Sequence, residues 1–170
     1  HIVRALAKRG YRIRAACRRP DLAGHLQPLG VPGQVMPVQA NVRYPASLAA
    51  ACDGAYAVIN LTGVLYSAGA QSFDAIHAFG AEASAKAARA ARARVFIQMS
   101  AIGADPGSSA AYARSKAEGE ARARAAFPGA IILRPSIVFG PEDSFFNRFA
   151  GLARFAPALP AGVRAAGRAG

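Results

Sequence analysis

The chain has 170 residues, of which 53% are hydrophobic, and a formal net charge of +12. The length suits one domain with a substantial core, and no apolar run reaches the roughly 20 residues of a membrane-spanning helix. The arginines are scattered, and the sequence has no zinc finger or RNA-binding aromatic motif, so no nucleic-acid partner is expected. RNA binding is kept only as a third hypothesis, whereas a membrane surface or an acidic partner subunit stays open.

Strand-like and helix-like segments alternate along the chain. After a helical pattern in "HIVRALAKRG", strands are predicted at "YRIRAAC", "QVMPVQA", "AYAVINL", "RVFIQMS" and "AIILRPSIVFG". Helices are predicted at "PASLAAAC", from Ser72 to Ala93, across "SSAAYARSKAEGEARARAAF" and at "DSFFNRFAGLARF", with a short helix or turn at "PDLAGHLQPLG". The alternation predicts an α/β fold: a doubly wound, mostly parallel sheet with helices on both faces.

In such sheets, ligands bind beyond the carboxyl ends of the strands. The segments to inspect are therefore those that follow the predicted strands: Cys17–Arg19, Ala40–Val42, Asn60–Gly63, Ser100–Gly103 and Pro135–Gly140. The two cysteines form no CxxC pair, and the three histidines do not cluster with acids at metal-ligand spacing. The thiols fit a reducing compartment, and no metal is expected.

Tyr112 stands four residues before Lys116 in a predicted helix, so the two side chains share a helix face. A nearby ammonium group favours the phenolate and is expected to lower the pKa of Tyr112, which would then exchange a proton with a hydroxyl or carbonyl. Ser100 ends the preceding strand and would polarise a substrate oxygen. The spacing also arises by chance, so it is a weak motif alone.

Three segments together resemble the extended or atypical branch of the short-chain dehydrogenase/reductase superfamily. They are "VFIQMS", "YARSK" beginning twelve residues after Ser100, and "AIILRPSIVFGP". Within this branch, "INLTG" and "RPSIVFGPEDSFFNRFA" resemble the NAD(P)H-binding accessory subunit of respiratory complex I, the alpha-subcomplex subunit 9 type, and its bacterial relatives. The resemblance covers residues 1–160 and implies an NAD(P)-binding Rossmann-type domain, followed by a low-complexity tail at 161–170.

The resemblance also implies roles for individual residues. Arg18, assisted by Arg19, would pair with a 2′-phosphate, which favours NADP(H) over NAD(H). Asn41 stands where the family often contacts adenine. Tyr112 and Lys116 would meet the nicotinamide and its ribose, with Ser100 as the third catalytic candidate. The remaining cofactor-lining residues would be Asn60, Leu61, Thr62, Gly63, Pro135, Ser136 and Ile137.

The sequence departs from the family in three ways. The glycine-rich phosphate loop and the strand before it are absent, and the first residue is His1, so the chain is expected to be an N-terminally truncated fragment of a Rossmann domain. Relatives also extend further at the C-terminus. In one register Ala101, rather than Ser100, occupies the position of the catalytic hydroxyl.

Two functional hypotheses follow from the resemblance. The first is a complex I-associated accessory subunit or assembly factor that holds NADPH, located in the cytoplasm or peripherally on the inner-membrane face. The alternative is an active oxidoreductase, epimerase or dehydratase that uses Tyr112 and Lys116 on a nucleotide-sugar, isoprenoid or quinone-like substrate. The sequence leaves enzymatic turnover open.

Overall fold

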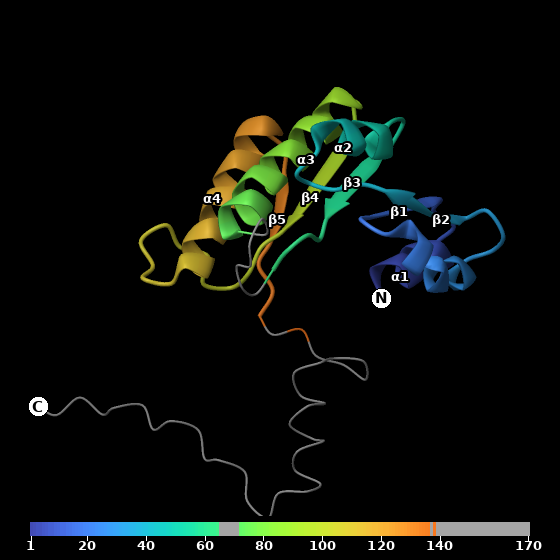
Figure 1. The fold of residues 1–170 in the computed structure, drawn as a ribbon, viewed down its shortest axis with the longest axis horizontal. Helices are drawn as coiled ribbons and strands as arrows, with labels where there is room; N and C mark the ends of the chain where they lie inside the picture. Colours follow the sequence, from blue (N-terminus) through green and yellow to red (C-terminus); the bar gives the residue numbers. More distant parts are fainter. Residues whose placement is uncertain (65–71, 137, 139–170) are drawn as a thin grey trace, which may run out of the picture. The chain divides into compact units, whose positions relative to one another are not determined.

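The computed structural model describes residues 1–64, 72–136 and 138. The chain divides into two compact units, His1–Pro135 and Ser136–Gly170, and the first unit contains all of the described helices and strands. Helices and strands alternate, which confirms the α/β prediction (Figure 1). In chain order the α-helices and strands are α1 (Ile2–Lys8), β1 (Ile13–Cys17), β2 (Val35–Gln39), α2 (Pro45–Cys52), β3 (Ala57–Asn60), α3 (Phe79–Ala90), β4 (Val95–Met99), α4 (Ala111–Ala126) and β5 (Ile131–Leu133). The short helix or turn predicted at "PDLAGHLQPLG" consists of two 3-10 helices, η1 (Pro20–Leu22) and η2 (Gly24–Leu29).

All strand pairs in the described part of the chain are parallel, and they form two sheets. One sheet has the order β1-β2, and the other has the order β3-β4-β5. A doubly wound Rossmann sheet has the strand order 3-2-1-4-5-6. The two sheets match the 3-2 and 4-5-6 parts of that order, so the position between β1 and β3 has no strand among the described residues.

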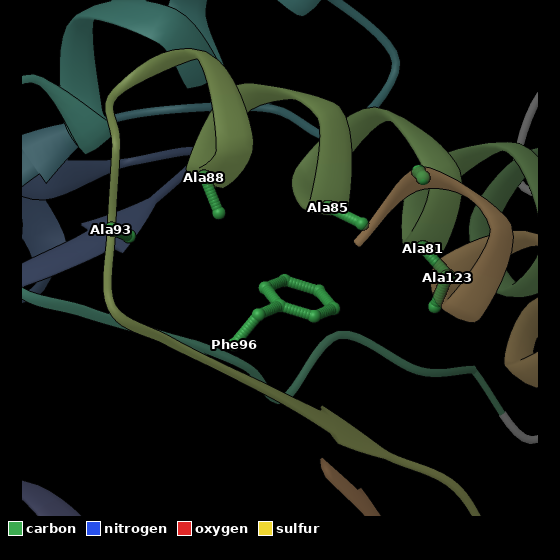
Figure 2. Close-up of a cluster of buried hydrophobic side chains, with 7 residues drawn as sticks. Ala81, Ala85, Ala88, Ala93, Phe96 and Ala123 are labelled. Carbon is green, nitrogen blue, oxygen red and sulfur yellow. The ribbon is translucent and has the colours of Figure 1, made fainter. Parts of the chain in front are cut away.

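Helices α3 and α4 lie side by side on one face of the β3-β4-β5 sheet (Figure 1). Phe96 on β4 is fully buried beneath α3, and the small side chains of Ala85 and Ala88 point toward its ring (Figure 2). Alanine allows the helix to approach the sheet closely, and one aromatic ring then fills the layer. Truncating Phe96 to alanine would cost roughly 3–5 kcal/mol, the usual range for a buried Phe.

The predicted helix from Ser72 to Ala93 is not a continuous α-helix. It contains a π-helical segment, η3 (Asp74–Ala78), and α3 then runs from Phe79 to Ala90. The wider π turn changes which side chains share a face, and such turns occur often at functional sites. This segment packs against α4 and carries the buried side chain of His77.

The last predicted strand is shorter than "AIILRPSIVFG". Strand β5 ends at Leu133, two residues before Pro135, which has no N–H group to extend the ladder. The predicted helix "DSFFNRFAGLARF" and the predicted tail at 161–170 lie outside the described residues. Over the ranges given above, no helix is long and apolar enough to cross a membrane.

Candidate functional site

Tyr112 and Lys116 lie together on α4, as the spacing predicted. Lys116 is only 6% exposed, and its Nζ atom lies 5.8 Å from the centroid of the Tyr112 ring. Burial lowers the pKa of Lys116, and the carboxylate of Glu120 partly offsets this effect. The prediction of a lowered Tyr112 pKa was wrong, because burial of the phenol raises the pKa.

Gly63 brings the loop after β3 against Lys116. A Cβ atom on Gly63 would lie 3.2 Å from Lys116 Nζ and 3.7 Å from His77 Nε2, so the absence of a side chain permits the close approach. The backbone of the "INLTG" segment therefore lies next to the ammonium group. Leu61 is exposed, and Thr62 is half-buried. The loop follows the carboxyl end of a parallel strand, which is where a ligand is expected.

Asn60 shapes this loop from within. Its side chain is buried, donates a hydrogen bond to Gln98 Oε1 at 2.9 Å, and accepts one from the backbone N–H of Thr62 at 3.1 Å. Asn60 is the register partner of Gln98, so the first bond crosses between adjacent strands. Both ends of the amide are committed within the protein, which favours a role in loop conformation over direct contact with a cofactor.

His77 is a buried residue of this site that the sequence analysis did not single out. It is 2% exposed, stacks on Phe73 with ring centroids 5.5 Å apart, and meets the Tyr112 ring edge-on at 5.3 Å. Its Nε2 accepts a hydrogen bond from the Val64 N–H at 3.0 Å, and its Nδ1 lies 2.9 Å from Ser115 Oγ. Burial, together with the charge of the lysine on α4, lowers the pKa of His77 to about 4, so the ring is neutral at physiological pH.

Ser100 is held by a buried carboxylate. Its hydroxyl donates a hydrogen bond to Glu120 Oε1 at 2.5 Å, and both residues are buried. Arg134 donates to both oxygens of the same carboxylate, at 2.8 and 2.6 Å. The Ser100 proton is therefore already used, and a substrate oxygen would have to displace Glu120 to receive it.

The arginines after β1 differ in their surroundings. Arg19 pairs with Asp21 at 2.7 Å, and both side chains are exposed. Arg18 is exposed as well, and within the described residues no ion pair is found for its guanidinium. An exposed arginine that pairs with no carboxylate fits an incoming phosphate better than one already bound to an acid.

The other predicted cofactor residues have mixed surroundings. Asn41 closes a local turn: its Oδ1 accepts from Arg43 N, and its backbone N–H donates to Ser47 Oγ. The carbonyl of Pro135 accepts a hydrogen bond from the N–H of Ile102 at 2.8 Å, which ties the segment after β5 to the loop after β4. Ser136 is exposed in the second unit, and Ile137 lies outside the described residues.

A surface groove of about 430 Å³ between α3 and α4 is not part of this site. Its charged lining residues pair with one another, since Glu82 binds both Lys86 at 2.5 Å and Arg122 at 3.2 Å. Arg122 follows Tyr112 by ten residues along α4, which corresponds to about 15 Å. The groove therefore offers neither unpaired charge nor proximity to Tyr112.

Parallel strands, flanking helices, and a Tyr–Lys pair facing a strand-end loop define a Rossmann-type α/β protein. A family model described as NAD(P)H-binding matches residues 1–138. The chain therefore belongs to this NAD(P)H-binding family, in agreement with the resemblance found in the sequence.

Curated relatives point to two kinds of protein. A ceramide reductase of Caulobacter vibrioides is 37% identical over 160 residues, which are 94% of this chain and 49% of the relative. Subunit 9 of the mitochondrial NADH dehydrogenase (ubiquinone) 1 alpha subcomplex of Dictyostelium discoideum is 31% identical over 161 residues, 94% of this chain and 45% of the relative. The chain thus spans about half the length of these relatives.

Solved structures show the same fold at low sequence identity. The triphenylmethane reductase of Citrobacter sp. complexed with NADP(H) has a TM-score of 0.63 and 17% identity, over 89% of this chain and 50% of that chain. A dTDP-4-dehydrorhamnose reductase of Bacillus anthracis in complex with NADP has a TM-score of 0.61 and 17% identity, over 83% of this chain and 60% of that one.

Proposed function

We propose that the chain is the nucleotide-holding part of an NADP(H)-binding protein of the complex I accessory-subunit type. The observation that carries this proposal is the close approach of Gly63, beyond the carboxyl end of β3, to Lys116, whose Nζ atom also lies 5.8 Å from the centroid of the Tyr112 ring. A buried ammonium group beside Gly63, which has no side chain, suits the hydroxyls of a ribose, and the half-buried Tyr112 ring suits a nicotinamide. The residues present therefore fit the nicotinamide and ribose of a dinucleotide, although the glycine-rich loop that would hold its pyrophosphate is absent from the sequence. The nucleotide would supply hydride chemistry when bound.

The preference for NADP(H) is proposed on the basis of Arg18. Its exposed guanidinium follows the first described strand, the place where a 2′-phosphate is received in Rossmann-type domains. Arg19 is the weaker candidate because Asp21 already occupies it. Two structurally similar reductases were solved with NADP or NADP(H) bound, which agrees with this preference for the fold.

Association with respiratory complex I is proposed from the relatives and from the charge. Several relatives carry the names of complex I subunits, including the subunit 9 protein of Dictyostelium discoideum. A chain with a net charge of +12 would bind an acidic subunit surface or the anionic membrane around it. The location that we propose is therefore the cytoplasm, peripherally at the inner-membrane face.

A working reductase, epimerase or dehydratase is the second candidate, and the ceramide reductase relative favours it. Tyr112 would exchange the proton, and Lys116 would hold the ribose. The bond from Ser100 to Glu120 argues against this candidate, because it engages the hydroxyl that would polarise the substrate. Exchanging Tyr112 for Phe separates the two hypotheses: an enzyme loses turnover while it keeps the nucleotide, whereas a holder has no turnover to lose.

Nucleotide binding is tested by titration. The protein is titrated with NADPH and with NADH, and nicotinamide fluorescence should show saturable binding that Lys116→Met weakens. The exposed Lys86 on α3 offers the matched control, Lys86→Met, which should bind like the wild type. Equal affinities in the two variants would place the nucleotide away from Lys116.

The partner is tested in membranes. The tagged protein is expressed in its own cell, the membranes are solubilised gently, and the extract is separated on a native gel. The tag should migrate with NADH:quinone reductase activity. A small species that migrates alone would exclude the subunit hypothesis and leave the free reductase.

A further inference from the structure

The imidazole of His77 joins two elements that the proposed nucleotide site requires. One ring nitrogen binds the backbone N–H of Val64, directly after the Asn60–Gly63 loop, and the other binds Ser115 on α4. Ser115 is the neighbour of Lys116 in the chain. The loop and the helix that carries the Tyr–Lys pair are thus connected through one buried side chain.

The hydrogen bonds determine where the ring proton lies. Val64 N–H is a donor, so the Nε2 atom of His77 must be the unprotonated acceptor. In the neutral ring the proton is then on Nδ1 and is donated to Ser115 Oγ. The Ser115 hydroxyl uses its own proton in a 2.8 Å bond to the carbonyl of Tyr112. Each of these three hydrogen bonds therefore has a defined donor and a defined acceptor.

The surroundings of His77 leave the ring little freedom to move. Phe73 stacks on the ring, and the Tyr112 ring meets it edge-on. The backbone carbonyl of His77 lies so close to Gly119 on α4 that a Cβ atom on Gly119 would clash with it. The same ring lies beside Gly63, at 3.7 Å from the position of a Cβ atom on that residue. Because the ring is held rigidly, its Nε2 atom fixes the distance between the Val64 backbone and α4.

We infer that His77 is a positioning residue for the dinucleotide: its Nε2 atom holds the Gly63–Val64 backbone against α4 in the geometry that binds the nucleotide. This inference rests on the proposed function, because it assigns the loop to the same nucleotide site. Asn60 fixes the start of the loop by accepting from Thr62, and His77 fixes its end by accepting from Val64. The loop is therefore held at both ends by buried acceptors.

Two substitutions separate the two ring nitrogens. The side-chain amide of glutamine reaches the place of Nε2 and can accept from Val64, whereas the shorter amide of asparagine reaches only the place of Nδ1, near Ser115. In His77→Asn the Kd for NADPH should rise about tenfold, as expected for the loss of one buried hydrogen bond, and in His77→Gln it should stay within about threefold of the wild type. The exposed His25 provides the control, His25→Asn, with unchanged affinity.

Hydrogen exchange at the Val64 amide gives a readout that does not depend on the nucleotide. The amide should exchange faster in His77→Asn and remain protected in His77→Gln. Equal affinities and equal Val64 protection in both variants would overturn the inference, as would equal losses in both. A wild-type protein that binds neither NADPH nor NADH would overturn the proposed function, and this outcome is distinguishable because it appears before any variant is compared.

Discussion

The hydroxyl of Ser100 donates its hydrogen bond to Glu120, and the two oxygen atoms are 2.5 Å apart. Burial alone would raise the pKa of Glu120, but the hydrogen bonds from Arg134 and Ser100 outweigh burial and hold the pKa below its usual value. The carboxylate is therefore charged, and it joins the ends of β4 and β5 to α4. Ser100 belongs to this structural network, which explains why a Tyr–Lys pair can be present without a free hydroxyl partner.

The first prediction concerns the stability that this network provides. Glu120→Ala leaves the buried Ser100 hydroxyl without its acceptor and removes an ion pair, so it should lower the free energy of unfolding by roughly 2–3 kcal/mol. Ser100→Ala removes one hydrogen bond while the ion pair remains, so it should cost only about 1 kcal/mol. Urea unfolding measures both losses.

The matched control for this network lies on the same helix. Glu118 also pairs with an arginine, Arg122, but its side chain is 51% exposed. An exposed pair contributes little, so Glu118→Ala should change the free energy of unfolding by less than about 1 kcal/mol. An equal cost for Glu118→Ala and Glu120→Ala would contradict the assigned network.

The second prediction concerns the choice of nucleotide. Arg18→Ala should weaken NADPH binding by about tenfold or more, because a charge-assisted bond to the 2′-phosphate is lost, and should leave NADH binding nearly unchanged. Titration of both nucleotides measures the ratio of the two dissociation constants. Arg19→Ala is the matched control, since its guanidinium is already paired with Asp21. If Arg19→Ala shifts the ratio and Arg18→Ala does not, the two arginines have been assigned the wrong way round.

The third prediction concerns the pH dependence of stability. His77 has a pKa of about 4 in the folded protein, lowered from 6.5, so the unfolded chain binds a proton at a higher pH than the folded chain does. The stabilisation that the neutral His77 ring provides is therefore complete above the pKa of His77 in the unfolded chain. It is lost as the pH falls toward the pKa of His77 in the folded protein. Between about pH 7 and about pH 5, His77 alone should account for a loss of about 2 kcal/mol.

The His77→Gln variant isolates this contribution. Glu120 also has a lowered pKa, so its stabilisation is present above the unfolded pKa of a carboxylate and is lost in more acidic solution. The variant keeps Glu120 and removes only the imidazole, so the difference between wild type and variant reports His77. If urea unfolding shows that this difference is the same at neutral and mildly acidic pH, the neutral buried state of His77 is refuted.

The fourth prediction concerns the contact between η3 and α4. A Cβ atom on Gly119 would collide with the backbone carbonyl of His77. This carbonyl cannot move aside as the end of a flexible side chain could. Glycine normally destabilises a helix interior by about 1 kcal/mol relative to alanine, yet here Gly119→Ala should destabilise by roughly 2 kcal/mol or more because the helices must separate. Gly24→Ala, with open space around the position, should be neutral within about 0.5 kcal/mol. Thermal unfolding of both variants makes the comparison.

The Tyr–Lys pair was predictable from the sequence because a four-residue spacing in a helix is a local property. The pKa of Tyr112 was not predictable in this way, because it depends on the burial of the phenol as well as on the lysine charge. His77 could not be found from helical spacing, because the π turn at Asp74–Ala78 changes which side chains face α4. No spacing in the sequence predicts that turn. The role of Glu120 was not predictable either, because its partners Ser100 and Arg134 follow two different strands and are distant from it in the sequence.

The strands themselves were predictable from short apolar runs, and their parallel pairing was predictable from the alternation with helices. The division into two sheets was not, because a strand pattern does not state which strands exchange backbone hydrogen bonds. Side chains connect the β1-β2 sheet to the helices beside it. Ala40, directly after β2, belongs to a buried cluster with Leu48 of α2 and Ala87 of α3. Arg14 of β1 donates to the carbonyls of Ala51 and Asp53.

The division into two sheets affects the local stability of the protein. No backbone ladder joins the two sheets across the described residues, so the β1-β2 part should unfold locally at a lower free energy than the layer around Phe96. Arg18 directly follows β1. A nucleotide that contacts Arg18 at one end and Lys116 at the other would therefore bridge the two sheets, and its binding should suppress this local unfolding.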